Sequence, residues 1–162
     1  VGHVPAVLSE RTLPITYRLA MSLSTATPAL PVRDIGAAVD HYVARFAFES
    51  PHHDSDFAIL VRGEARIHLW HSNDETWRAR PPDDLRECPV RSGAESFLAG
   101  TASCRIAVDS LESVNLLHRE FAASKVLHPG DSGSPVDTDF GTREFATVDI
   151  DGNLLEFYFR HL

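Results

Sequence analysis

The chain contains two segments of similar pattern, and this internal duplication constrains its fold more than any other sequence feature. Each segment starts with a short apolar strand, continues through a polar helix cap into an amphipathic helix, and is followed by further strand signals. The apolar stripes of the two helices align at an offset of 75 positions, Val39 with Val114 and Phe46 with Phe121. We therefore expect an α+β fold of two βαβββ modules, each with a curved mixed sheet open on one side and with a cleft between them.

The first module is expected over residues 25 to 71. A short strand at residues 28 to 32 precedes Asp34, which is a typical helix N-cap, and strand signals follow at 46 to 50, 57 to 63 and 65 to 71. The helix stripe consists of Ile35, Val39, Tyr42, Val43 and Phe46.

The second module is expected over residues 102 to 160. A strand at 103 to 108 precedes a helix that either Asp109 or Ser110 caps, with Glu112 completing a capping box. Its stripe consists of Leu111, Val114, Leu117 and Phe121. Residues 128 to 141 are rich in turn formers and predict a weak strand at most.

A hairpin closes the second module, and its last strand contains one acid among apolar residues. Asp151-Gly152 predicts a tight turn between the two strands. The alternation of the second strand places Leu154, Glu156 and Tyr158 on one face. Three roles remain open for Glu156: a metal ligand, a polar contact for a ligand, or a solvated acid.

Two segments lie outside the modules. Residues 72 to 101 are rich in Pro, Asp, Arg, Gly and Ser, and we interpret them as a linker loop. Residues 1 to 21 have mixed polarity without a period and end at Met21, the only methionine, so we expect a peripheral extension before a domain at 22 to 162. Deleting residues 1 to 20 is then expected to leave the melting temperature nearly unchanged.

Composition narrows the class of partner. The 162 residues have a formal net charge of −8 and no run of Lys and Arg, which argues against nucleic acid and fits a neutral or cationic small molecule. No apolar run is long enough for a membrane span, and the two cysteines form no CxxC pair, so we expect a cytoplasmic protein with reduced thiols. A nucleophile elbow and a phosphate-binding glycine loop are also absent.

Three strings give the chain a family resemblance. The segments 26 to 42, 59 to 70 and 140 to 153 resemble the vicinal oxygen chelate superfamily, which contains glyoxalase I, extradiol dioxygenases and bleomycin resistance proteins. The resemblance covers about residues 25 to 160 and is strongest to the bleomycin resistance proteins. Enzymes of the superfamily take metal ligands from the first and last strand of each module, and the similar positions here are Thr27, His68, Arg105 and Glu156. Only His68 and Glu156 are donors, and Arg105 repels a cation, so the resemblance implies no metal cofactor and a pair of Arg105 with Glu156.

The resemblance also implies a function and a site. Bleomycin resistance proteins bind their drug without a metal of their own, between aromatic side chains in grooves at the interface of a homodimer that exchanges strands. A homodimer that binds an aromatic or cationic small molecule, and that confers antibiotic resistance by sequestration, is therefore expected here. The expected ligand-binding residues are Phe48, His53, His68, Trp70, Arg105, Phe140 and Glu156.

Two alternatives remain open. One is a metal-dependent glyoxalase-like lyase or a dioxygenase, with His68 and Glu156 as ligands of a divalent metal that would stabilise an enediolate or related charge. The other is a structural module that binds a protein partner through the 72 to 101 loop.

Overall fold

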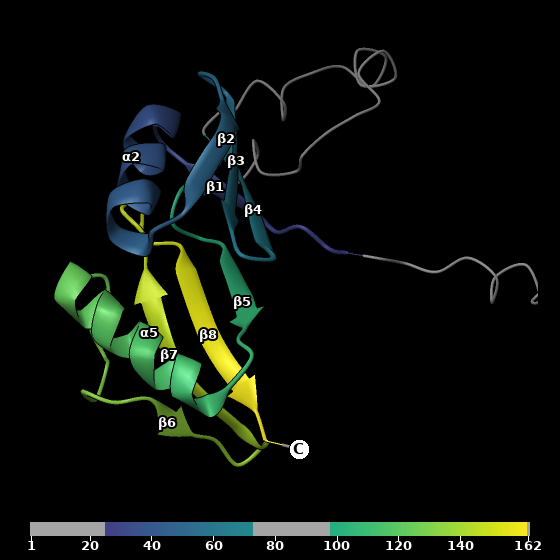
Figure 1. Ribbon diagram of the computed structural model, residues 1–162. Coiled ribbons are helices and arrows are strands. Elements are labelled where there is room, and N and C mark those ends of the chain that lie inside the picture. The colour runs from purple at the N-terminus through teal and green to yellow at the C-terminus, as the bar shows by residue number, and fades with distance from the viewer. Residues whose placement is uncertain (1–24, 73–97, 162) are drawn as a thin grey trace, which may run out of the picture.

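The computed structural model describes residues 25 to 72 and 98 to 161. These form two modules, each a four-stranded sheet covered by one helix, which lie one above the other in Figure 1. The first module contains β1 (Ala29–Val32), α2 (Ile35–Phe46), β2 (Glu49–His53), β3 (Phe57–Arg62) and β4 (Ala65–His71). The second contains β5 (Ser103–Ala107), α5 (Leu111–Ser124), β6 (Val136–Asp137), β7 (Thr142–Val148) and β8 (Leu154–Arg160). The expected α+β fold of two βαβββ modules is confirmed.

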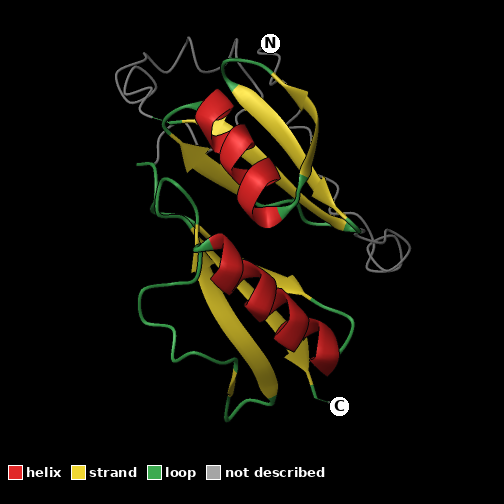
Figure 2. Cartoon of the chain, turned by 60° about the vertical axis from the view of Figure 1, so that its left-hand side comes forward, coloured by secondary structure: helices red, strands yellow, loops and turns green. Residues whose placement is uncertain are grey.

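The two sheets have the same topology. Their strand orders are β1-β4-β3-β2 and β5-β8-β7-β6. In each sheet the first strand pairs in parallel with the last strand of its module, and the other pairs are antiparallel. Each helix is thus the crossover of a strand-helix-strand unit and covers one face of its sheet. Figure 2 shows both helices on the same side of the molecule, so within the described residues no helix covers the other face of either sheet.

Side-chain caps set the start of each helix. The Asp34 carboxylate accepts a hydrogen bond from the backbone N–H of Ala37 at 2.7 Å, as expected for an N-cap. Ser110, and not Asp109, caps α5, and its hydroxyl accepts from the N–H of Ser113 at 3.1 Å. The predicted capping box with Glu112 is wrong, because the third helical position after Ser110 is Ser113.

The core of the molecule runs continuously through both helices. Phe46 of α2 and Phe121 of α5 meet with ring centroids 5.1 Å apart, and Phe121 continues to Phe157 at 5.0 Å. Tyr42, Phe46 and Phe121 are fully buried. The predicted stripes are correct except at two exposed positions, Val43 and Leu111. In α5 the buried stripe includes His118, which the sequence pattern did not indicate.

The hairpin between β7 and β8 has a wider turn than the predicted two-residue connection. Residues 149 to 153 form it, and only Gly152 has a positive φ, at 98°. The Asp149 carboxylate accepts from the backbone N–H groups of Asp151 and Asn153, at 2.9 and 2.8 Å. The backbone N–H of Gly152 also donates to the carbonyl of Asp149 at 3.1 Å and closes a tight turn, so the predicted Asp-Gly turn is present, within a connection longer than two residues.

Two other boundaries differ from the expectation. The strand signal at residues 46 to 50 is shifted, since Phe46 ends α2 and β2 begins at Glu49. The weak strand in the turn-rich segment is β6, which has two residues. The N-terminal extension and most of the 72 to 101 loop lie outside the described residues. Neither described helix is long and apolar enough to cross a membrane.

Candidate functional site

The open faces of the two sheets contain most of the predicted site residues. In β4, Ile67 and Leu69 are buried toward the helix, so His68 and Trp70 point to the other side. In β8, Leu155 and Phe157 are buried toward the helix, so Glu156 and Tyr158 point to the other side. We call these surfaces the first open face (Phe57, Ile59, His68 and Trp70) and the second open face (Arg105, Glu144, Glu156 and Tyr158).

The first open face is aromatic. Phe57 of β3 lies between its two neighbours on β4, with its ring centroid 4.8 Å from that of Trp70 and 5.0 Å from that of His68. All three rings are only half-buried. Burial lowers the pKa of His68, and the nearby Arg66 lowers it further, so the imidazole is neutral at neutral pH. The face therefore presents flat, uncharged rings that have no cover in the described chain.

The second open face is a cluster of charges around one arginine. Arg105 of β5 lies beside Glu156 in the parallel register, and its Nε is 3.1 Å from a carboxylate oxygen of Glu156. Its Nη2 donates to Glu144 of β7, which also accepts from the hydroxyl of Thr142 at 2.7 Å. The guanidinium lies 4.6 Å from the ring centroid of Tyr158. The predicted pair of Arg105 with Glu156 is confirmed.

This charge cluster is accessible. The side chains of Arg105 and Glu156 are 44% and 30% exposed. The pair is therefore not buried, because within residues 25 to 72 and 98 to 161 no second layer covers this face of the sheet. Two carboxylates surround one guanidinium, so the cluster has a surplus negative charge that suits a cation or a hydrogen-bond donor.

A metal centre does not fit these residues. Within residues 25 to 72 and 98 to 161, no group of three or more His, Cys, Asp and Glu side chains converges on one point. His68 lies against Phe57 in one sheet, and Glu156 is paired with Arg105 in the other. A permanent cation 3.1 Å from the carboxylate opposes a divalent ion at Glu156.

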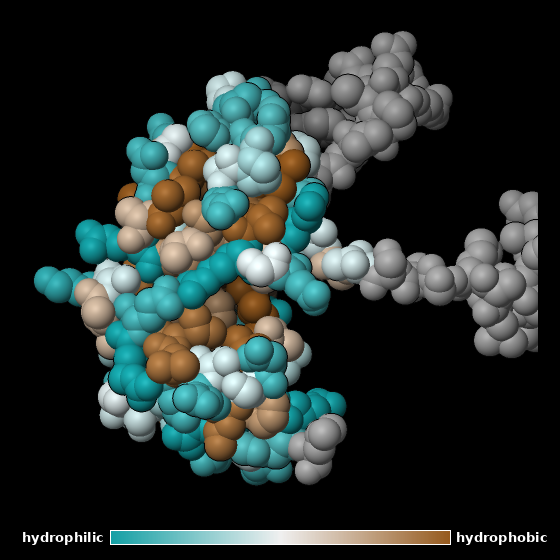
Figure 3. Space-filling view, viewed as in Figure 1, coloured by the Kyte–Doolittle hydropathy of each residue, from teal (hydrophilic) through white to brown (hydrophobic). Residues whose placement is uncertain are grey.

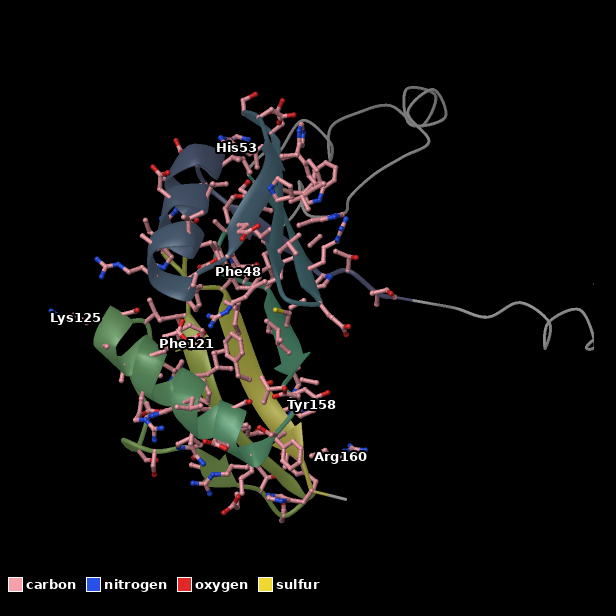
Figure 4. The ribbon with its side chains drawn as sticks, viewed as in Figure 1. Phe48, His53, Phe121, Lys125, Tyr158 and Arg160 are labelled. Carbon is pink, nitrogen blue, oxygen red and sulfur yellow. The ribbon has the colours of Figure 1, made fainter. Side chains whose placement is uncertain are left out.

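The structure separates the remaining predicted site residues. Phe48 is only 2% exposed and packs edge-on against Tyr42, with ring centroids 5.8 Å apart (Figure 4). The expectation that Phe48 lines a groove does not fit this placement, because the core covers its ring. Phe140, in contrast, is 62% exposed in the turn before β7. His53 ends β2 at the top of Figure 4, exposed, with its Nδ1 3.4 Å from the Ser50 hydroxyl.

Four residues of the open faces were missing from the predicted site, among them Ile59, which lies opposite His68. Phe57 joins the aromatic group, and Glu144 and Tyr158 complete the charge cluster. Strand alternation already placed Tyr158 on the face of Glu156, and this signal identifies it. Phe57 and Glu144 depend on the pairing register between strands, in which Phe57 lies opposite Trp70 and Glu144 opposite Tyr158. That register is not readable from one strand alone.

Comparison with known proteins gives close relatives. No model of a known protein family matches the chain. A bleomycin resistance protein of Geobacillus stearothermophilus is 43% identical over 131 residues, which cover 81% of this chain and 92% of that protein. A bleomycin resistance protein of Staphylococcus aureus gives the same identity and coverage.

Solved structures agree with the fold. The bleomycin-binding protein of Streptomyces verticillus, crystallised with copper(II)-bleomycin, is 25% identical, with a TM-score of 0.57 over 85% of this chain and 96% of that one. The lactoylglutathione lyase of Agrobacterium tumefaciens has a TM-score of 0.64 at 18% identity, over 86% of this chain and 96% of that one. The second similarity concerns the fold alone.

Proposed function

Since the chain belongs to the bleomycin resistance proteins of the vicinal oxygen chelate superfamily, we propose that it binds a bleomycin-type drug and confers resistance by sequestering it. The observation that carries the proposal is the pair of open faces, one aromatic and one with surplus negative charge. A drug with a flat aromatic part and a cationic part matches these two surfaces. Binding requires no bond to form or break, so no catalytic residue is assigned.

The first open face would hold the flat part of the drug. Phe57 and Trp70 already lie ring against ring at 4.8 Å and keep exposed area for a further ring. Each additional aromatic contact contributes about 1 kcal/mol beyond the area that it buries. Phe140 is exposed in a turn of the other module, so the Phe140 of a second copy of the chain is the candidate for covering these rings.

The second open face would bind the charged part. Arg105 holds Glu144 and Glu156 in fixed positions, so their remaining carboxylate oxygens are preorganised as acceptors. The overall charge of −8 attracts a cationic drug from a distance.

A second copy of the chain would complete the groove. The described residues leave both faces open, and the two modules are stacked end to end (Figure 1), so a ligand on either face has no cover from this part of the chain. On the helix side, which Figure 3 views, apolar surface also lies in both modules on either side of a polar band. A homodimer would cover the first and second open faces and form the aromatic-lined groove that the family resemblance implies. We include exchange of strands between the two copies in this proposal.

Calorimetric titration with bleomycin tests the function. We expect one bound drug molecule per groove. Trp70→Ala should weaken binding by about 1 to 2 kcal/mol, and Trp70→Phe should weaken it less, because it keeps an aromatic ring. Glu156→Gln is expected to weaken binding less at high salt than at low salt, because it removes a charge. Glu64→Gln, an exposed acid in the β3–β4 turn, is the charge-matched control. Unchanged affinity in both Trp70→Ala and Glu156→Gln would contradict the placement of the site.

Two further measurements separate the proposal from the metal-dependent alternative. Elemental analysis of the purified protein is expected to find no stoichiometric metal, and sedimentation is expected to find a dimer. One metal per chain that Glu156→Gln removes would instead indicate an enzyme of the superfamily.

A further inference from the structure

A cavity at the junction of the two modules lies apart from the open faces. Its volume is about 510 Å³, within the range of small-molecule sites. The residues around it come from the β3–β4 turn, the end of β5 and one side of α5: Arg62, Gly63, Val108, Asp109, Ser113, Leu116, Leu117 and Glu120. It is on the helix side of the molecule, since Arg62 lies over the ring of Phe121 at 5.5 Å.

One wall of the cavity is fixed by an ion pair between the modules. Arg62 donates to both carboxylate oxygens of Glu120, each at 2.9 Å, and also to the carbonyl of Phe46 at 2.6 Å. Glu120 neutralises this guanidinium, and its Nη groups already have acceptors. Arg62 therefore shapes the cavity and does not attract an anion into it.

Asp109 supplies the charge that a ligand would meet. Its Oδ1 accepts from the Ser113 hydroxyl at 2.6 Å, and within the described residues its Oδ2 has no hydrogen-bond partner; Asp109 is exposed and lines the cavity. Leu116, which is 50% exposed, and Val108 and Leu117 form an apolar wall beside it. An apolar wall next to one carboxylate is complementary to an organic cation with a hydrophobic body.

We infer that the junction cavity is a second binding site, which takes a small organic amine with an aromatic or aliphatic body. The ammonium group donates to Asp109, and the body lies on Val108, Leu116 and Leu117. The ligand contacts the β3–β4 turn of one module and α5 of the other, so its binding stabilises their association. The site is independent of the drug groove proposed above.

The test uses phenethylamine and its neutral isostere 2-phenylethanol as probes of the full chain, followed by backbone amide NMR. We expect saturable shifts of the Gly63, Asp109 and Leu117 amides with the amine. The alcohol, and Asp109→Asn with the amine, are expected to bind about two- to fivefold more weakly, since an exposed charge pair has that strength. Asn keeps an acceptor for Ser113, so the fold should persist.

Two variants provide the controls. Leu116→Trp fills the cavity from an exposed position and should abolish the amide shifts that phenethylamine causes, while bleomycin binding stays unchanged. Asp139 is an exposed acid in another turn, so Asp139→Asn should leave the amide shifts unchanged. Equal binding of amine and alcohol, shifts that Leu116→Trp does not remove, or no shifts at all would overturn the inference. Loss of bleomycin binding in Trp70→Ala with intact amine shifts would show that the two sites are separate.

Discussion

At the residue scale, the most connected polar side chain in the described chain is Asp149. Its carboxylate, buried at the start of the β7–β8 turn, accepts from the hydroxyl of Tyr42 at 3.0 Å and from the side-chain amide of Asn153 at 2.8 Å, besides two backbone N–H groups. Burial, then the Asp149 charge, raises the pKa of Tyr42 well above its usual value, so Tyr42 remains a donor. This one acid links the helix of the first module to the hairpin of the second.

We expect Asp149→Ala to lower the free energy of unfolding by about 2 to 4 kcal/mol, because it leaves several buried donors without an acceptor. Urea denaturation measures this. Asp139→Ala, an exposed acid, is the matched control and should stay within about 0.5 kcal/mol of the parent. Equal effects of the two variants would contradict the role of the buried network.

Cys104 is a second residue whose buried environment affects a measurable property, the reactivity of its thiol. It is only 8% exposed, and burial, followed by the charges of Asp149 and Glu156, raises the pKa of its thiol to about 11. In a Cys88→Ser background we expect a thiol reagent at pH 8 to react with Cys104 only after urea is added. Rapid labelling of the native protein would show that the core over β5 opens readily.

At the element scale, both helices end in a residue that is not glycine and yet is left-handed. Ala47 follows α2 with φ 52°, and Lys125 follows α5 with φ 59°. Glycine is the usual residue at such a position, because a Cβ is strained there. The sequence correctly predicted where α2 begins, since Asp34 is a recognisable cap, and it left Asp109 and Ser110 as two candidate caps of α5; neither helix end has a glycine signal.

Ala47→Gly is therefore expected to raise the free energy of unfolding by roughly 0.5 to 1 kcal/mol, measured by urea denaturation. Ala44→Gly, at an exposed position inside α2, is the control for glycine itself and should lower it by about 1 kcal/mol. If both substitutions lower the free energy of unfolding, the strain energy at Ala47 is smaller than the entropic cost of ordering a glycine on folding.

The strands and turns also differ in how far their part of the site could be predicted from the sequence. Alternation along β8 predicted that Glu156 and Tyr158 share one face, and both point away from the helix. The sites of His68 and Trp70 on β4 were expected from the family resemblance, and these residues also lie on the face away from the helix. The prediction that Phe48 lines a groove does not fit the structure. The sequence pattern of an aromatic residue after a helix is the same whether its side chain enters the core or a groove. The Asp-Gly turn between β7 and β8 was predicted, but the length of the connection was not, because it depends on the Asp149 side chain, which contacts Tyr42 from 107 positions away.

At the scale of the whole molecule, the two modules share one core. Phe46 and Phe121 meet between the helices, Arg62 bonds to Glu120, and the Asn153 amide donates to the carbonyl of Pro31 at 2.9 Å. Aromatic packing, an ion pair and a buried hydrogen bond therefore all cross the junction. The duplication in the sequence predicted the two modules, but these contacts depend on how the modules meet.

We expect the protein to unfold in a single transition despite its two modules. Both tryptophans, Trp70 and Trp77, lie in the first half of the sequence, so their fluorescence reports that half while far-ultraviolet circular dichroism reports the whole chain. The two curves should coincide, and Phe121→Ala should shift both together by about 3 to 5 kcal/mol. Separated curves in the parent protein would show that the junction contacts are too weak to couple the modules.

The continuous core across the junction has a practical consequence for engineering. Among the described residues, contacts between the modules come from α2, β1, the end of β3, α5 and the β7–β8 turn. Two polypeptides that correspond to the modules thus have matching surfaces without needing a covalent connection. Such fragments are candidates for a split selection marker, in which drug tolerance returns only when two fused partners bring the halves together.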